Sequence, residues 1–446
     1  MSVAEVGMAL FFAVLGALVA SILSLVPALH IYNVAGFVIL ATATLGKMEN
    51  AVPPELLAFF FLGMTTGYAM LNTIPSIFLA APDDSTIFVV LPGQKYLLQR
   101  RGYEAVVLTG IGGLGGIAVL ALLTPVASSL FPALRAILQP HLHWILWTVI
   151  AYMLMSEWPK GSDRAPAGWR RWWDGWRSLT AGLITFLLSG LLGFILLYRS
   201  LVPVTMAYQN LLPAFAGLFA VPWILQNILS RVELPEQHIT RTVDGTPWLF
   251  LRGTFAGALG GLFAAFFPVV TGGIGGFIAG HATAQRDDRL FIISQGASKV
   301  VYYVGGFLFF FVPGLHLTRG GMAWMLSSLW SSYTPQTYYL AVAAVVLTGV
   351  ISFFTLLLMT RVAIKLVGKV HYRWISLGTL VVLLAIVVGM TGPGGFLICA
   401  VATGIGLIPV LWGSRRMNCM GVLLLPIALN MVGVGGMVAG WLGLVQ

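Results

Sequence analysis

The sequence has little charge. Only 9% of its 446 residues are Asp, Glu, Lys or Arg, 59% are hydrophobic, and the mean hydropathy is +0.94. A water-soluble domain needs a surface rich in charged side chains, so this shortage excludes the soluble class. Apolar runs of about 20 residues, the length that crosses a bilayer, recur along the chain. We therefore expect an all-α, polytopic integral membrane protein that lies in the lipid bilayer of the plasma (cytoplasmic) membrane.

Cysteines and catalytic motifs are also scarce. The two cysteines, Cys399 and Cys419, lie in or beside apolar segments, so no disulfide framework is expected. The chain contains no HExxH, GxSxG, CxxC or Walker motif, and no pair of acids inside an apolar segment, so the sequence does not indicate an enzyme. His141 and His143 point apart on a helix and stand beside tryptophans, which favours an interfacial role. We expect no metal site and no cofactor, apart from Na⁺ as a candidate coupling ion.

The net charge of +10 results from 24 basic and 14 acidic residues. In a membrane protein, basic residues mainly mark cytoplasmic loops, so we expect no nucleic-acid partner. The short basic loop 157–178 is expected to be cytoplasmic. Its WRRWWDGWR core, Trp169–Arg177, is expected to anchor the chain at the interface, with specific binding of an anionic lipid as the alternative.

The most informative stretch is Gly257–Gly280, GALGGLFAAFFPVVTGGIGGFIAG. Proline removes a backbone donor and clashes with the preceding turn, so this apolar segment should break at Pro268. Gly16 and Pro27 show the same spacing 241 positions earlier (257 − 16 and 268 − 27), and Pro75 marks a further break. Interrupted helices in corresponding halves indicate the binding site of a transporter. The alternative is that glycine and proline are simply common in membrane helices.

The offset predicts two homologous transmembrane repeats with Pro/Gly-broken re-entrant helices. Residues 1–230 would form the N-terminal repeat, 231–247 a polar loop, and 248–446 the C-terminal repeat. Hydropathy gives roughly eleven to thirteen membrane elements, with re-entrant arms in addition.

The candidate binding residues are polar groups beside these breaks and along one apolar segment. They are His30, Asn33, Asn72, Ser76, Thr271, Gly272, Gly273, Ser294, Gln295, Ser298 and Lys299. An ammonium group such as that of Lys299 is costly in lipid and needs a partner or a ligand; the alternative is that it extends to an interface near Asp287 and Asp288. The adjacent acids Asp83 and Asp84, like Asp287 and Asp288, are interpreted as solvated loops, with cation or arginine binding as the alternative.

The breaks also predict the charge of the ligand. The N-terminus of a half-helix presents free N–H groups and the positive end of a dipole, which favour an anion. The helix starts near His30 and near Thr271 would suit a carboxylate or a phosphate. Freed carbonyl groups at the opposing half-helix ends would suit Na⁺ or H⁺.

Four segments resemble the archaeal-type TctA family, membrane permeases related to the large subunit of tripartite tricarboxylate transporters. These are LVPALHIYNV (25–34), NTIPSIFLAAPDDSTIFVVLPGQKYLLQRRGYEAV (72–106), FFPVVTGGIGGFIA (266–279) and SRRMNCMGVLLLP (414–426). The resemblance implies two homologous halves with re-entrant hairpins and secondary transport of an organic di- or tricarboxylate coupled to Na⁺ or H⁺. Bacterial systems of this kind also use a small membrane subunit and a periplasmic binding protein. Nothing in this sequence indicates auxiliary subunits, and a homo-oligomer is left open.

Two features separate this chain from that pattern. Family members usually carry a Pro-Gly pair at both breaks, whereas this chain has Ala28 and Val269 after the prolines, which removes backbone freedom at the site. Pro268–Gly273 is also similar to the Pro-Gly-x-Ser-Gly-Gly signature of polyprenyl-phosphate translocases. The alternative function is therefore translocation of a polyprenyl-phosphate lipid carrier, and a non-transporting membrane scaffold is a third hypothesis.

Overall fold

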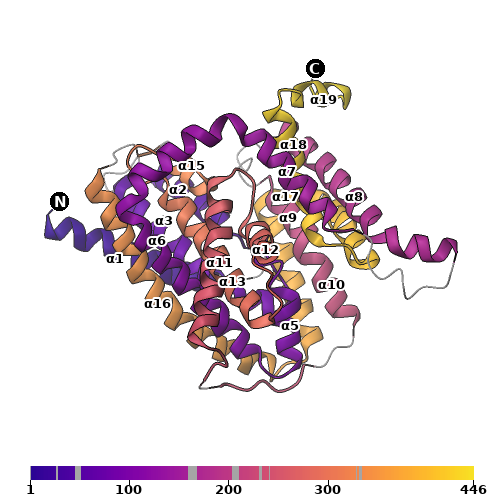
Figure 1. The fold of residues 1–446 in the computed structure, drawn as a ribbon, viewed down its shortest axis with the longest axis horizontal. Coiled ribbons are helices and arrows are strands. Elements are labelled where there is room, and N and C mark those ends of the chain that lie inside the picture. Colours follow the sequence, from indigo (N-terminus) through magenta and orange to yellow (C-terminus); the bar gives the residue numbers. More distant parts are fainter. Residues whose placement is uncertain are drawn as a thin grey trace. The chain divides into compact units, whose positions relative to one another are not determined.

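The computed structural model describes residues 2–26, 29–45, 52–158, 168–202, 210–230, 234–240, 242–327, 329–330 and 334–445, and every regular element in these ranges is a helix (Figure 1). Eight of these helices are long and apolar enough to cross a membrane, or nine if one bent pair is a single span. The predicted all-α membrane class is therefore confirmed. Pro27, Ala28 and parts of the predicted loops 157–178 and 231–247 lie outside the described residues.

The chain forms two compact units. Unit 1 comprises Met1–Ile137 and Ser230–Leu377, and unit 2 comprises Leu138–Leu229 and Gly378–Gln446. Each unit takes residues from both predicted repeats, and the predicted 231–247 loop falls inside unit 1. The units do not test the repeat boundaries, so the two repeats stay a prediction.

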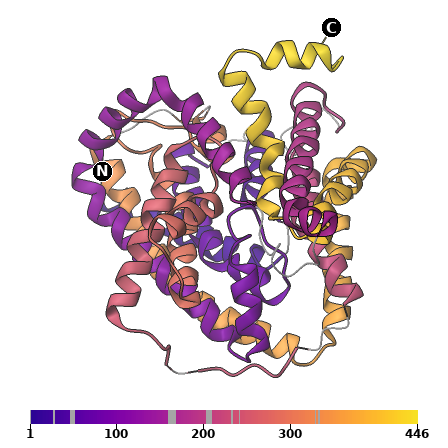
Figure 2. The same cartoon turned by 45° about the vertical axis from the view of Figure 1, so that its right-hand side comes forward.

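Unit 1 holds the predicted breaks. Its N-terminal helices are α1 (Val3–Leu23), α2 (Ile31–Leu45), α3 (Pro54–Leu71), α4 (Thr73–Phe78), α5 (Val90–Leu98) and α6 (Gly102–Leu138). Its later helices are α11 (Pro247–Phe266), α12 (Gly272–Ala282), α13 (Asp288–Val300), η5 (Val301–Gly305), α14 (Gly306–Leu308), α15 (Gly320–Ser327) and α16 (Pro335–Val367). The helices α11, α12 and α13 lie side by side (Figures 1 and 2).

Unit 2 is built from the middle and the end of the chain. Its elements are η1 (Gln139–His141), α7 (Leu142–Met155), α8 (Trp169–Tyr198), α9 (Leu212–Phe215), η4 (Ala216–Ala220), α10 (Val221–Leu229), most of α17 (Tyr372–Trp412), η6 (Arg416–Met420), α18 (Gly421–Met431) and α19 (Gly435–Trp441). The helix α18 packs along α8, and η6 contacts α7, α8 and η4.

Glycines allow the helices of unit 1 to pack backbone against backbone. A Cβ atom added to Gly257 of α11 would overlap the carbonyl group of Ser294 in α13, and one on Gly112 of α6 would overlap that of Ile293. Without a hydrophobic driving force between helices in lipid, such close approach is a main source of packing energy. These contacts fix α13, which carries Lys299, between α6 and α11.

Gly296 provides a test of this packing. An added Cβ would lie 2.7 Å from the Cα atom of Thr109 in α6, so Gly296→Ala is expected to push the helices apart and destabilise the protein by about 1–3 kcal/mol. Gly389→Ala in α17 is the matched control, because nothing lies within 4 Å of its added Cβ. Thermal unfolding in detergent compares the two variants, and equal melting temperatures would contradict the close approach.

The helix is interrupted around Pro268. α11 ends at Phe266, and α12 begins at Gly272 with Thr271 as its N-cap. α2 begins at Ile31, and its offset from Gly272 (272 − 31 = 241) equals that of the two sequence motifs. Pro75 lies inside α4, and the interruption there falls at Asn72, one turn earlier. A proline disturbs the turn that precedes it, which accounts for this shift.

Val269 adopts a conformation that normally requires glycine. Its φ is +59°, in the left-handed region, where a β-branched side chain is a genuine outlier. This is the position at which TctA-type sequences usually have the glycine of the Pro-Gly pair. Val269 therefore adopts a conformation that glycine would adopt freely.

We therefore expect Val269→Gly to destabilise the protein less than Val270→Gly. Both Val269 and Val270 are buried, so both variants lose a similar apolar contact, but only Val269→Gly relieves a strain of about 1–3 kcal/mol. We expect Val269→Gly to melt at a higher temperature than Val270→Gly in the same detergent. The reverse order would show that the backbone of Val269 is not strained.

Candidate functional site

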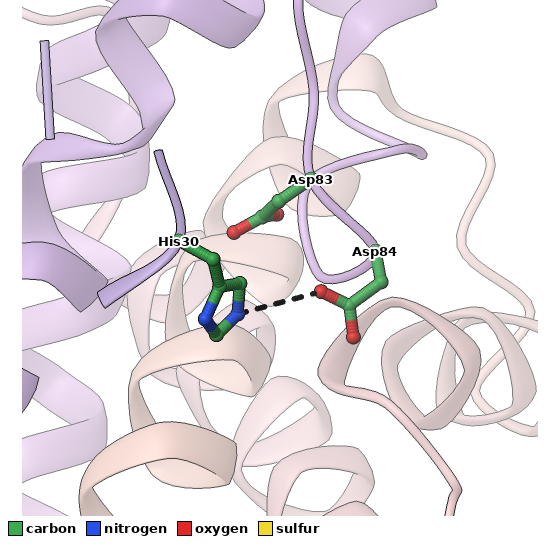
Figure 3. A group of neighbouring side chains, drawn as sticks. All are labelled: His30, Asp83 and Asp84. Atoms are coloured by element: carbon green, nitrogen blue, oxygen red, sulfur yellow. Dashed lines mark ion pairs between the residues drawn. The ribbon is translucent and has the colours of Figure 1, made fainter. Parts of the chain in front are cut away.

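A polar cluster in unit 1 surrounds a short turn between α4 and α5, residues 83–86, which we call the acidic turn (Figure 3). The turn is organised by one carboxylate oxygen. Oδ1 of Asp83 accepts hydrogen bonds from the backbone N–H groups of Ser85 (3.0 Å) and Thr86 (2.8 Å), and from both of their hydroxyl groups (2.8 Å each). The side chain of Asp83 therefore fixes its own loop, as aspartates do at tight turns.

The other oxygen of Asp83 joins this turn to distant helices. Oδ2 accepts from the hydroxyl of Tyr68 (2.9 Å) and the amide of Asn72 (2.8 Å), both at the end of α3, and from the hydroxyl of Tyr303 (3.1 Å) in η5. Seven donors thus point at one half-buried carboxylate. Its two oxygens have little remaining capacity to accept hydrogen bonds from a ligand, because groups of the protein already occupy them.

Asp84 is much less engaged. Its Oδ1 lies 3.4 Å from the hydroxyl of Tyr303 and 3.9 Å from Nε2 of His30, and within the described residues Oδ2 has no hydrogen-bond partner. The side chain of Asp84 is 13% exposed. Of the two acids, Asp84 is the one that retains the capacity to bind a ligand.

His30 presents a proton to this cluster. Its Nδ1 accepts the backbone N–H of Tyr32 (3.2 Å), so in the neutral ring the proton is on Nε2, which lies 3.1 Å from the hydroxyl of Tyr303. One ligand atom from each of His30, Asp83 and Asp84 lies within 4.8 Å of the others, a spacing that could hold a metal ion. However, Nε2 carries a proton and Asp83 is saturated. The arrangement therefore suits a weakly held cation or a proton at Asp84 better than a transition metal.

The second helix break contacts the same turn. The hydroxyl of Thr271 donates to the backbone carbonyl of Asp84 (3.2 Å), and a Cβ atom on Gly273 would lie 2.8 Å from that oxygen. Ser298 donates to the carbonyl of Gly272 (2.8 Å). His30, after the first break, and Thr271, at the second, therefore both contact Asp84.

Lys299 is buried and points inward. It is 1% exposed, and its ammonium group donates to Oδ1 of Asn72 (2.8 Å) and to the hydroxyl of Thr73. It therefore does not extend toward Asp287 and Asp288. Its contacts tie α13 to the junction of α3 and α4.

The pairs Asp83/Asp84 and Asp287/Asp288 differ in their surroundings, although the sequence analysis interpreted both as solvated loops. Asp288 pairs with Lys95 at the surface, and the Arg289 guanidinium hydrogen-bonded to Asp287 holds the pKa of that carboxyl below its usual range. This pair is a partly exposed loop. By contrast, Asp83 and Asp84 are enclosed by residues from distant parts of the chain, so the solvated-loop interpretation does not describe them.

Other predicted residues have supporting or separate positions. The hydroxyl of Ser76 lies 2.8 Å from that of Thr86 and helps to hold the acidic turn. The N–H of Asn33 donates to the carbonyl of His30 at the start of α2. Ser294 and Gln295 are buried in the α11–α13 packing, where the Gln295 amide lies against Gly276, and their side chains form no hydrogen bond with described residues.

Several residues of the cluster were not among the predicted site residues. Besides the two acids, these are Tyr68, Thr73, Tyr303 and Arg319. Arg319 donates to the carbonyls of Ala264 (3.1 Å) and Val270 (2.8 Å), which holds the two sides of the second break together. Arg319 could have been selected from the sequence as a lone arginine among apolar residues. Nothing in the sequence distinguished Tyr68 and Tyr303 from other tyrosines.

These features define a class of protein: a multi-pass helical membrane protein whose interrupted helices enclose buried charges and polar groups, as in secondary transporters. Residues 10–421 match the model of the tripartite tricarboxylate transporter TctA family, and the chain therefore belongs to this family. An uncharacterized protein of Methanocaldococcus jannaschii is 26% identical over 430 residues, covering 94% of this chain and 97% of that protein. No solved structure matches.

Membership in TctA, a transporter family, confirms the resemblance drawn from the four sequence segments. The comparisons lend no support to the alternative of a polyprenyl-phosphate translocase.

Proposed function

We propose that the protein is a secondary transporter of an organic di- or tricarboxylate in the cytoplasmic membrane, coupled to Na⁺ or H⁺. The observation that carries the proposal is the convergence of both helix starts on Asp84, where His30 and Thr271 contact the same residue. The family supports transport of this substrate class. The geometry supports an anion and a cation in one site.

The carboxylate would bind at the N-terminus of α12. The N–H groups at Gly272 and Gly273 belong to the first turn of α12, which has no intrahelical partners, so they can donate to a carboxylate. Thr271 adds a hydroxyl at the same point. The backbone of Lys299 packs against this first turn, because a Cβ atom added to Gly272 would lie 3.0 Å from the Cα atom of Lys299.

The cation would bind at Asp84, which supplies the reason for coupling. A substrate carboxylate at α12 meets the negative charges of Asp83 and Asp84, and this repulsion is strong because a buried site screens charge poorly. A Na⁺ ion or proton at Asp84 removes part of that charge and so raises the affinity for the anion. By linkage, the anion raises the affinity for the cation equally.

Two variants test this arrangement in proteoliposomes that contain the full chain. Thr271→Ala removes the hydroxyl that caps α12 and joins it to Asp84, and Asp84→Asn removes the cation site; each should abolish gradient-driven uptake of labelled citrate or succinate while folded protein is retained. Asp288→Asn is the control, because its carboxylate pairs with Lys95 at the surface. Wild-type uptake under Na⁺ and proton gradients in turn identifies the coupling ion.

A binding assay separates failure of the proposal from a need for auxiliary subunits. Citrate should raise the melting temperature of the purified protein, since a ligand bound only to the folded state stabilises it by mass action, and the coupling cation should increase the shift. Gradient-driven uptake by Asp84→Asn at the wild-type level would remove Asp84 from the mechanism. No stabilisation by any carboxylate, with either cation, would contradict the proposed substrate class.

A further inference from the structure

Unit 2 contains a buried arginine without an acidic partner. Arg416, the first residue of η6, is 7% exposed, and its guanidinium carbon lies 3.6 Å from the centre of the Trp223 ring in α10. Its Nη1 is 3.4 Å from the carbonyl oxygen of Phe219, a long hydrogen bond. Within the described part of the chain, no carboxylate forms an ion pair with it. A buried charge in this situation is costly unless an anion compensates it.

Glu157 contacts residues on either side of Arg416. Oε1 of Glu157 accepts the backbone N–H of Arg415 (2.5 Å) and the side-chain amide of Asn418 (3.2 Å). The guanidinium group of Arg415 itself donates to the carbonyl of Ser156. Two adjacent arginines therefore differ: Arg415 is bound into the end of α7, whereas Arg416 turns toward η4 and α10.

Some N–H donors of Arg416 and Trp223 have no hydrogen-bond acceptor among the described residues. A guanidinium group has five N–H donors, and only those on Nη1 have a hydrogen-bond acceptor among the described residues. Nε1 of Trp223, in the ring on which Arg416 stacks, is inaccessible to solvent and also has no partner there. The stacked pair thus offers donors and positive charge, but no acceptor of its own.

The position of η6 indicates where an anion would come from. η6 contacts α8, in which Gly182 lies against Asn418, and Ser178 of α8 donates to the carbonyl of Glu157 (3.4 Å). Ser178 directly follows Trp169–Arg177, where Trp169, Trp172 and Trp173 are exposed. Tryptophan and arginine collect at the level of the lipid headgroups, where phosphate groups are abundant.

We propose that Arg416 and Trp223 form a binding site for a phosphate-bearing anion, either the headgroup phosphate of an anionic lipid or free phosphate. A guanidinium group matches the geometry of phosphate oxygens with two parallel N–H donors. The indole N–H, which is closed to solvent and has no partner among the described residues, would donate to a further oxygen after a rotation of the Trp223 side chain. The site lies entirely in unit 2 and does not rest on the proposed transport function.

The test is a thermal-unfolding series on the purified full chain in detergent. The probes are short-chain phosphatidylglycerol, inorganic phosphate, citrate, and short-chain phosphatidylcholine, whose headgroup has no net charge. Phosphatidylglycerol or phosphate should raise the melting temperature of the wild type more than phosphatidylcholine does. Arg416→Gln should weaken this binding about tenfold or more, since it removes charge-assisted hydrogen bonds. Arg199→Gln, which removes an exposed charge from unit 2, should leave it unchanged.

The probes distinguish the two sources. Stabilisation by phosphatidylglycerol alone assigns the site to a lipid headgroup, and equal stabilisation by inorganic phosphate assigns it to the free ion. The proposal is overturned if neither probe stabilises the wild type beyond phosphatidylcholine, if Arg416→Gln responds like the wild type, or if Arg199→Gln loses the response equally. Stronger stabilisation by citrate that depends on Arg416 would also overturn it, because the ligand would then be a carboxylate.

A second pair of variants covers the case in which Arg416→Gln does not fold. Trp223→Phe keeps an aromatic ring under the guanidinium group but removes the N–H donor, and Arg416→Lys keeps the charge but removes the paired donors. Both should bind the phosphate probe more weakly than the wild type. Unchanged binding by both variants would contradict the assigned site.

Discussion

Replacing Asp83 by alanine is expected to destabilise the protein by about 3–5 kcal/mol, the range observed when one partner of a buried charged network is removed. The change leaves seven donors without their acceptor, from the acidic turn, from the end of α3 and from Tyr303. Each buried donor without a partner costs free energy that no other contact returns. Unfolding in detergent or in bicelles, followed by thermal or steric-trapping methods, measures the loss.

Asp84→Ala is the matched control for this prediction. Asp84 is the next residue on the same turn, but its carboxylate has only a 3.4 Å contact with the hydroxyl of Tyr303, whose single proton is shared with the closer Asp83. We expect a loss of stability of at most about 1 kcal/mol, the net value of an ordinary hydrogen bond. If both alanine variants unfold alike, the division into a structural Asp83 and a ligand-binding Asp84 is wrong.

Replacing Lys299 by methionine is expected to reduce the affinity for a carboxylate substrate by about tenfold or more, because it removes a buried positive charge from a residue whose Cα atom packs against Gly272 at the α12 N-terminus. The variant also leaves Oδ1 of Asn72 and the hydroxyl of Thr73 without their donor. Citrate-dependent stabilisation and uptake should both fall. The melting temperature without ligand should fall as well, so the ligand-induced shift is the decisive measurement.

Lys95→Met is the control for the loss of a lysine in unit 1. Lys95 forms a surface ion pair with Asp288, and such exposed pairs contribute about 0–1 kcal/mol. Its citrate response should equal that of the wild type. A full citrate response in Lys299→Met would instead restrict Lys299 to a structural role between α13 and Asn72.

Part of the fold and some residues of the candidate site were accessible from the sequence. The shortage of charge indicated a helical membrane protein, and the proline rule located the interruption before Thr271. His30, Asn72 and Thr271 were selected as polar groups near breaks and contact the acidic turn, and Lys299 was selected as a charge along an apolar segment and contacts Asn72.

The sequence could not predict the burial of side chains that are enclosed by residues far away along the chain. Asp83 and Asp84 were interpreted as a solvated pair because two adjacent like charges tend to be solvated. Their enclosure results from Tyr303, 220 residues later, and from the backbone of α12. The same limit applies to Ser294 and Gln295: periodicity along α13 shows that they are on a helix, but not that they pack toward α11 and α12 rather than toward Asp84.

The distance in sequence between Asp83 and Tyr303 has a consequence for biogenesis. The ribosome makes Asp83 220 residues before Tyr303, and 216 residues (299 − 83) before Lys299, whose ammonium group holds Asn72. In that interval the nascent first half must accommodate a carboxylate with only part of its final partners. Ser85 and Thr86, made directly afterwards, supply four of the seven donors at once. Hydrogen bonds within the turn therefore satisfy part of the Asp83 carboxylate until the second half of the chain is inserted and Tyr303 adds its hydroxyl.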